Sequence, residues 1–148
     1  GHAVTVFDRS AARLTLFDGS AIAIDQNLDD LSAFDAVVEA TGDPDALTAI
    51  LDRSAAGSVL LLLGLPYARR SFSFETIVGY DKTVVGSVGS AAEDFAEAVT
   101  ILPSIDTSAF HRAVMTLEQY AQAWDLARAR THLKVIIQVD PSPELGQT

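Results

Sequence analysis

The sequence predicts an α/β fold, a doubly wound and mostly parallel sheet with helices on both of its faces. Strand-like and helix-like segments alternate from the first residues onward, which is the pattern that parallel sheets with crossover helices produce. Hydrophobic residues make up 49% of the 148 residues and charged residues 20%, the balance of a chain that folds around a core. A chain of this length fits one ordinary domain, so one core is expected.

Three short strands are expected in the first part of the chain. They occupy residues 3–7, 21–24 and 35–40. In each, apolar and β-branched residues cluster, and turn residues follow. Ser10 can cap a short helix that reaches Phe17, because a serine hydroxyl accepts from the free amides of a first helical turn. Residues 25–32 are acidic and polar, which predicts a loop or a short helix.

The middle of the chain predicts a helix and two further strands. Asp43 and Pro44 begin the helix, since proline at the first helical position has no amide to leave unpaired, and the helix runs to about residue 55. Residues 58–63 are almost wholly apolar, which is typical of a central parallel strand covered on both faces. Residues 83–88 form the second of these strands.

The last third predicts three helices and a closing strand. The helices occupy residues 91–102, a short stretch that begins at Thr107 or Ser108, and residues 117–130. The first and third of them repeat apolar residues at the spacing of one helical face. The strand covers residues 133–139, and a polar tail with two prolines follows. We therefore expect one domain over residues 1–140 and a tail over residues 141–148.

Charge and hydropathy exclude two classes of partner. Asp and Glu number 20 against 10 Lys and Arg, and the net charge of -10 repels phosphate backbones, so no nucleic-acid partner is expected. The longest apolar run, residues 59–65, is far shorter than the roughly 20 residues that cross a bilayer, and no basic segment precedes an apolar one near the N-terminus. The sequence thus predicts a cytoplasmic protein without a membrane partner.

The motifs of metal sites and of nucleophilic catalysis are absent from the sequence. It contains no cysteine, and His2, His111 and His132 lack the spacing that puts two ligands on one helical face. No Gly-x-Ser-x-Gly elbow, His-Glu-x-x-His helix or Gly-Lys-Ser phosphate loop occurs. The sequence therefore predicts no metal site and no catalytic residue in this chain.

Polar and small residues follow several of the predicted strands. Asp8 comes directly after the first strand, where a dinucleotide-binding fold uses a carboxylate to bind the adenosine ribose, but it can equally cap the next helix. Glycine-containing ends follow three later strands, at residues 40–42, 64–66 and 86–90. Such ends share one sheet edge, where ligands bind, although each glycine can also serve only a tight turn.

Four stretches of the sequence resemble the C-terminal part of medium-chain, zinc-type alcohol and sugar dehydrogenases. They are DAVVEATG at 35–42, GSVLLLLGLP at 57–66, DKTVVGSVGSAAEDFAEAV at 81–99 and HLKVIIQVD at 132–140. Their order and spacing match that superfamily, with the glucose 1-dehydrogenase branch as the most similar. The resemblance implies a Rossmann-like domain that binds NAD(P) in an oxidoreductase acting on an alcohol, a polyol or a sugar.

By position, the resemblance assigns ten residues to the cofactor site. They are Asp8, Arg9, Thr41, Gly42, Gly64, Leu65, Pro66, Ser87, Val88 and Lys134. Asp8 matches the residue that binds the adenosine ribose, and its acidity implies NAD, whereas Arg9 permits NADP. Lys134 matches a basic position that reaches the pyrophosphate. Gly89 stands where the glucose branch often has an asparagine, a departure from that branch.

Two parts of the family pattern are missing from the sequence. One is the first strand with its Gly-x-Gly-x-x-Gly turn, which would precede Gly1, and the other is the GroES-like catalytic domain that supplies the zinc ligands. The resemblance thus implies a partial domain that is inactive and binds NAD weakly by itself, with zinc only in the absent catalytic domain. The alternatives are a non-catalytic α/β module for partner binding and one chain of a split dehydrogenase.

The expected strand order leaves a place in the sheet open. In the order 3-2-1-4-5-6, the missing strand lies between residues 3–7 and residues 35–40, so these two segments should not pair directly. Unpaired strand edges attract other strands. We expect a strand from a neighbouring chain in a homo-oligomer, or residues 133–139, to occupy the place.

Overall fold

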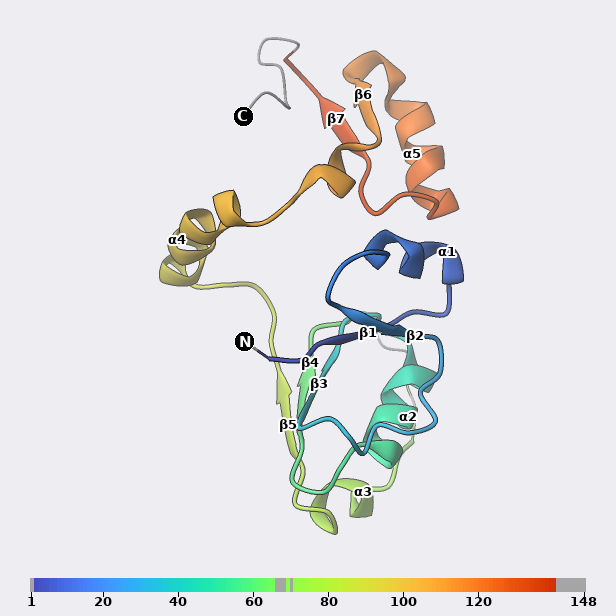
Figure 1. Ribbon diagram of the computed structural model, residues 1–148, viewed down its shortest axis with the longest axis vertical. Helices are drawn as coiled ribbons and strands as arrows, with labels where there is room; N and C mark the ends of the chain where they lie inside the picture. The colour runs from blue at the N-terminus through green and yellow to red at the C-terminus, as the bar shows by residue number, and fades with distance from the viewer. Residues whose placement is uncertain (1, 66–68, 70, 141–148) are drawn as a thin grey trace. The chain divides into compact units, whose positions relative to one another are not determined.

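The structure is a computed structural model that describes residues 2–65, 69 and 71–140. The chain divides into two compact units, Gly1–Ala91 and Ala92–Thr148. Each unit contains helices and parallel strands, so the predicted α/β fold with parallel sheets is confirmed (Figure 1). The predicted tail, residues 141–148, lies outside the described residues.

The first unit contains two parallel sheets (Figure 1). Its strands are β1 (Thr5–Phe7), β2 (Ala23–Asp25), β3 (Ala36–Glu39), β4 (Val59–Leu62) and β5 (Thr83–Gly86). Strand β1 pairs with β2, while β3, β4 and β5 form the second sheet with β4 in the middle. The predicted central place of the apolar strand is thereby confirmed.

Strands β1 and β3 are not paired with each other in the part of the chain that the structure describes. Strand β1 pairs with β2, and β3 pairs with β4. This agrees with the predicted strand order, in which one further strand lies between them. The facing edges of β1 and β3 are therefore without a partner strand among the described residues.

The first unit has three helices among its described residues, and the first two begin where the sequence predicts caps. They are α1 (Ala11–Leu14), which continues as a 3-10 turn (Thr15–Phe17), α2 (Pro44–Arg53) and α3 (Glu75–Val78). The hydroxyl of Ser10 accepts from the amide of Arg13 at 3.3 Å, and Oδ1 of Asp43 accepts from the amide of Asp45 at 2.9 Å. Helix α3 was not predicted, because a single turn is too short to show an apolar periodicity.

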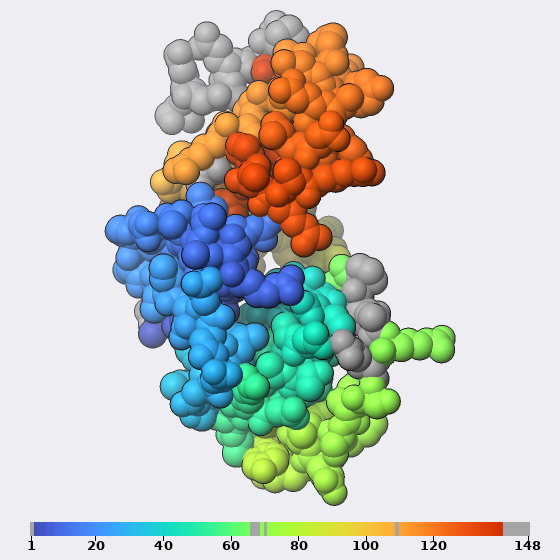
Figure 2. Space-filling view, turned by 90° about the vertical axis from the view of Figure 1, so that its right-hand side faces the viewer, coloured from blue at the N-terminus to red at the C-terminus, as the bar shows by residue number. Residues whose placement is uncertain are grey.

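A buried cluster of four aliphatic side chains forms the core of the first unit. Its members are Leu31, Ile50, Leu51 and Leu60. They come from the β2–β3 segment, from α2 and from β4, and Phe7 and Phe34 pack against them as an edge-to-face pair with ring centroids 5.6 Å apart. Figure 2 shows the β2–β3 segment, in light blue, beside α2 in teal. The core thus holds α2 against one face of the β3–β5 sheet.

The other face of this sheet is largely exposed within the first unit. Val38, Leu61 and Val85 are register partners across the three strands, and Val38 is 56% exposed and Val85 43%. Within the first unit, β4 is therefore covered on one face, and the cover of its other face stays a prediction. Helix α2 packs only on the face that carries Leu60, and Val59 on the other face is 42% exposed.

The second unit contains two helices and a small parallel sheet (Figure 1). Its elements are α4 (Ala92–Ile101), the 3-10 turns Leu102–Ser104, Ser108–His111 and Leu117–Gln119, β6 (Val114–Thr116), α5 (Tyr120–Ala129) and β7 (Ile136–Gln138). The predicted helices and the closing strand are confirmed in type. Their apolar residues are mostly exposed, as Phe95 in α4 and Trp124 in α5 illustrate.

Strand β7 pairs in parallel with β6, with α5 as the connection between them. The prediction that residues 133–139 would pair with an open edge of β1 or β3 is therefore wrong. Strand β6 itself was not predicted, because three residues between two 3-10 turns give no recognisable strand pattern.

Lys82 is a buried cation between α3 and β5. Its side chain is 7% exposed, its Nζ donates to the Leu51 carbonyl near the end of α2 at 2.6 Å, and it lies 5.3 Å from the Tyr80 ring centroid. Burial lowers the pKa of the ammonium below its ordinary value of 10.5, although the Asp52 carboxylate acts in the opposite direction. The lysine thus donates to a carbonyl near the helix end, where the helix itself offers no amide as a donor.

This lowered pKa predicts a pH-dependent stability. Between the lowered pKa of the folded chain and the ordinary value of 10.5, the unfolded chain binds more protons, so the free energy of unfolding rises with pH. Lys82→Met removes this titration and leaves the other groups in place. Urea unfolding of both chains at several pH values up to about 10 should therefore show the wild-type free energy gaining on that of the variant. A wild-type free energy of unfolding that stays constant or falls with pH, relative to that of Lys82→Met, would contradict the burial of the charge.

Candidate functional site

The ends of β3 and β4 are joined through their backbones. The amides of Leu63 and Gly64 both donate to the Glu39 carbonyl, at 2.8 and 3.1 Å. Because the two strands are parallel, the chain leaves both of them at the same sheet edge. Four of the sequence-predicted cofactor residues meet there. They are Thr41 and Gly42 after β3, and Gly64 and Leu65 after β4.

The two turns approach so closely that each needs a glycine. Gly42 has a φ of +71°, and a Cβ there would lie 3.0 Å from the amide nitrogen of Leu65. A Cβ on Gly64 would overlap the Gly42 amide nitrogen and Oε2 of Glu39, and would lie 2.7 Å from the Gly42 Cα. Gly42 thus serves both a turn with positive φ and the close approach of the two backbones, and Gly64 serves the close approach.

A buried carboxylate, Glu39, organises the turn after β3. Its side chain belongs to a residue only 2% exposed. Oε1 accepts from the Thr41 amide at 2.7 Å and from the Thr41 hydroxyl, and both carboxylate oxygens accept from the Gly42 amide at 3.2 Å. The role of Glu39 was not predicted from the sequence. The available signal was an acidic residue at the end of an apolar strand, which is costly unless it is hydrogen-bonded.

The carboxylate of Asp8, at the end of β1, is engaged with its own helix. Oδ1 accepts from the Ser10 amide at 2.8 Å, and Oδ2 lies 3.5 Å from Nη1 of Arg13. Asp8 thus stabilises the turn that leads into α1, whose cap is Ser10, and does not itself cap the helix. This geometry leaves Asp8 partly exposed, as a ribose ligand also requires.

Arg9 links the ends of the two strands whose edges are open. Its Nη1 lies 3.1 Å from Oδ2 of Asp43, the cap of α2, and its side chain is 85% exposed. An ion pair this exposed is worth about 1 kcal/mol or less, so Arg9 can exchange one anionic partner for another.

The end of β5 continues the same edge. The Ser87 amide donates to the Leu62 carbonyl at 3.0 Å, which extends the pairing of β4 and β5 by one residue. Val88 beyond it is 83% exposed, and Leu65 after β4 is 67% exposed. We call this set of strand-end residues the cofactor edge: Thr41, Gly42, Gly64, Leu65, Ser87 and Val88. The cofactor edge combines backbone groups, hydroxyls and exposed apolar side chains.

Besides Asp8 and Arg9, two further predicted residues do not belong to the set that forms the cofactor edge. Lys134 is an exposed residue of the second unit, just before β7, and Pro66 lies outside the described residues. The described residues also contain no group of three or more His, Cys, Asp or Glu side chains that is able to hold a metal ion. Nor does any described helix have the length and apolar character needed to cross a membrane.

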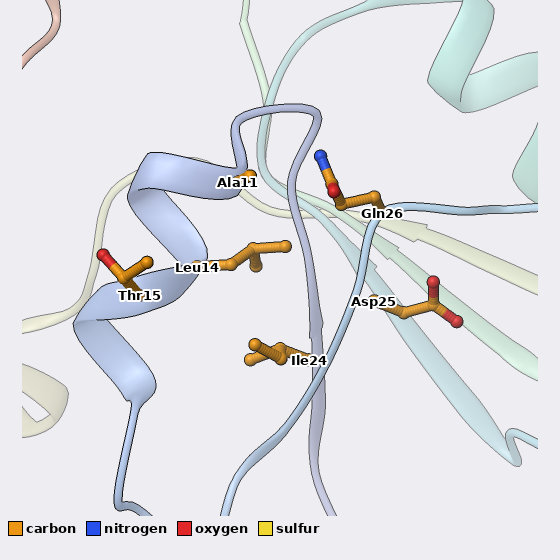
Figure 3. Close-up of a pocket in the computed structure, with 6 residues that line it drawn as sticks. All are labelled: Ala11, Leu14, Thr15, Ile24, Asp25 and Gln26. Carbon is orange, nitrogen blue, oxygen red and sulfur yellow. The ribbon is translucent and has the colours of Figure 1, made fainter.

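Two cavities among the described residues have linings that include no residue of the cofactor edge. One, of about 430 Å³, lies between α1 and β2, where Leu14 and Ile24 point toward each other (Figure 3). Ala11, Thr15, Asp25 and Gln26 complete its lining. Another, of about 310 Å³, lies in the second unit at Trp124 and Arg128, whose guanidinium is 5.6 Å from the indole ring centroid.

The fold is shared with several solved dehydrogenases. An alcohol dehydrogenase from Thermotoga maritima has a TM-score of 0.79 at 21% identity, over 95% of this chain and 44% of its own. L-idonate 5-dehydrogenase from Escherichia coli has a TM-score of 0.75 at 22% identity, over 89% of this chain and 41% of its own. Glucose dehydrogenase from Haloferax mediterranei, in complex with NADP, Zn and gluconolactone, has a TM-score of 0.71 at 19% identity, over 93% of this chain and 43% of its own.

The chain thus spans less than half the length of these solved structures. No curated protein sequence matches it. The family model described as the glucose dehydrogenase C-terminus matches residues 14–139, which include every strand from β2 to β7. Because this match covers most of the 148 residues, the chain belongs to the glucose dehydrogenase C-terminus family.

Proposed function

We propose that the chain is the cofactor-binding part of an NAD(P)-dependent, zinc-type oxidoreductase that acts on an alcohol, a polyol or a sugar. The observation that carries this proposal is the cofactor edge, where the ends of three parallel strands present two packed turns and exposed apolar side chains. Ligands of open α/β sheets bind at such carboxyl ends. The family membership supports the same conclusion.

The residues of the cofactor edge fit a dinucleotide. Glycines Gly86 and Gly89 leave open space beside the backbone, since a Cβ on either would meet no atom within 4 Å. In our proposal, Thr41 and Gly42 line the ribose, while Leu65 and Val88 cover the nicotinamide with apolar surface. A bound nicotinamide would supply the acceptor for a hydride from the substrate carbon. The chain's own contribution is to hold and orient this ring.

The described residues do not fit zinc, because they hold no cluster of suitable side chains. We propose that the zinc of a complete enzyme is bound outside them, and that this chain's residues take no part in its chemistry. The inactivity of this chain by itself belongs to the same proposal.

A titration with NAD, followed by amide NMR, tests the proposal. The sequence contains no Gly-x-Gly-x-x-Gly turn to meet the pyrophosphate, so the expected affinity is only about millimolar, or roughly -4 kcal/mol. Chemical-shift changes should concentrate on Thr41, Gly42, Gly64, Ser87 and Val88. Changes confined to other residues, or none up to about 20 mM, would contradict it.

We further propose that NAD is preferred over NADP, because a carboxylate at Asp8 suits two ribose hydroxyls and repels a phosphate. In a chain extended by the strand and Gly-x-Gly-x-x-Gly turn of the family pattern, Asp8→Ser is expected to weaken NAD binding by about 1 to 3 kcal/mol, the scale of hydrogen bonds to a charged group, and NADP binding by less. The dissociation constants come from an NMR titration of that extended chain. Asp29→Ser is the matched control, since Asp29 also pairs with an arginine, Arg53, at 2.8 Å. Equal weakening of both cofactors would show that Asp8 acts only on the turn before α1.

The exposed apolar side chains favour a second candidate function, a module that assembles with a partner or with copies of itself. Val38 and Val85 on the sheet, and Phe95 and Val99 on α4, are each more than two-fifths exposed. Sedimentation of the purified chain tests this candidate. A monomer at every accessible concentration would argue against assembly with copies of itself.

A further inference from the structure

We propose that Glu39 is the positioning residue of the cofactor edge, which it prepares for a dinucleotide by holding the Thr41–Gly42 turn in one conformation. The inference rests on the proposed function, because it takes the cofactor edge as the binding surface. Glu39 itself faces the turn and the neighbouring strand end, so it acts on a ligand only through these residues.

The donors around the carboxylate explain why this position carries a negative charge. The amides of Thr41 and Gly42 and the hydroxyl of Thr41 all point at its two oxygens. An ionised carboxylate only accepts hydrogen bonds, so it satisfies all of these donors at once. A carboxamide has one accepting oxygen, and its NH₂ group would face the Gly42 amide at the place of the other.

The burial of the charge indicates a purpose beyond filling the core. A buried carboxylate is costly, and an apolar residue at the end of β3 would pack without that cost. The apolar residue would, however, leave the first amides after β3 without a fixed acceptor. The carboxylate therefore stabilises the conformation of the turn, because β3 itself is already held by its pairing with β4.

The Gly64 contact transmits this geometry to the next strand end. Oε2 of Glu39 occupies the place where a side chain at Gly64 would begin, next to the Gly42 amide. Gly42 in turn lies against the backbone of Leu65, which carries an exposed apolar side chain of the cofactor edge. One carboxylate thus fixes the positions of both turns that the dinucleotide would touch.

The test compares Glu39→Gln with Glu75→Gln, which removes the same charge from an exposed residue of α3. Each chain is first shown to be folded by its amide spectrum, and three quantities are then measured: amide exchange at Thr41 and Gly42, amide exchange at Leu61 and Val85 in the sheet, and the NAD dissociation constant. Glu39→Asp is a milder second variant, since it keeps the charge and withdraws it by one methylene.

In Glu39→Gln we expect exchange at Thr41 and Gly42 to accelerate at least tenfold relative to Leu61 and Val85, and NAD to bind at least fivefold more weakly. Glu39→Asp should show the same pattern with smaller changes, and Glu75→Gln should match the wild-type chain. Acceleration at all four amides in step, or unchanged NAD affinity beside a loosened turn, overturns the positioning role while the proposed function stands. A wild-type chain that binds no NAD overturns the proposed function, and the inference with it.

Discussion

Gly64→Ala is expected to lower the free energy of unfolding by about 3 kcal/mol, at the upper end of what overpacking usually costs. A Cβ at this position meets the backbone of Gly42 and the buried carboxylate of Glu39, and neither is the free end of a flexible side chain. The two turns must separate, which breaks the hydrogen bond from the Gly64 amide to the Glu39 carbonyl. Urea unfolding followed by circular dichroism gives the value.

Gly86→Ala is the matched control, because Gly86 also ends a strand of the same sheet but a Cβ there would meet nothing within 4 Å. Its free energy of unfolding should change by less than about 0.5 kcal/mol, or rise slightly as the unfolded chain loses freedom. If the two variants are equally stable, the ends of β3 and β4 do not pack as described.

Leu60→Ala is expected to cost about 3 to 4 kcal/mol of stability. Leu60 is fully buried in β4 and belongs to the cluster that joins the sheet to α2, so its truncation loses apolar burial and leaves a cavity. Leu63, in the same stretch of sequence, is 44% exposed, and Leu63→Ala should cost less than about 1 kcal/mol. Equal losses would mean that the cluster around Leu60 is not the core of the first unit.

The elements with strong local signals were predictable from the sequence. Asp43 followed by Pro44 marked the start of α2, and the apolar run of β4 marked the centre of the sheet. Both features depend only on neighbouring residues, because a cap, a proline and a short apolar run each act locally. The strand ends that carry the cofactor edge followed from the same signals.

Features that depend on distant residues were not predictable in the same way. The role of Glu39 becomes visible only when the turn after β3 folds back onto it and Gly64 arrives from the next strand. Gly64 and Gly42 each follow an apolar strand in the sequence, so the sequence does not distinguish them. In the structure, Gly64 permits the close approach of two backbones and Gly42 has a positive φ. Strand β6 required a partner, β7, that lies some twenty residues further along the chain.

The sequence left two roles open for Asp8, ribose binding and helix capping, and the reason is structural. A carboxylate directly after a strand lies close to the free amides of the next helix whether or not a ribose is present. The contacts of Asp8 with Ser10 and Arg13 are local ones, and the sequence could suggest them but could not choose between the two roles.

The most direct test of the central claim is to locate a bound dinucleotide on the chain. Isotope-filtered nuclear Overhauser spectra of the methyl-labelled chain with saturating NAD report which methyl groups lie next to the cofactor. Contacts from the nicotinamide protons to the methyls of Leu65 and Val88 are the predicted result, since these are the exposed apolar side chains of the cofactor edge. Contacts instead to Leu14 and Ile24, in the cavity between α1 and β2, would place the ligand elsewhere and contradict the account.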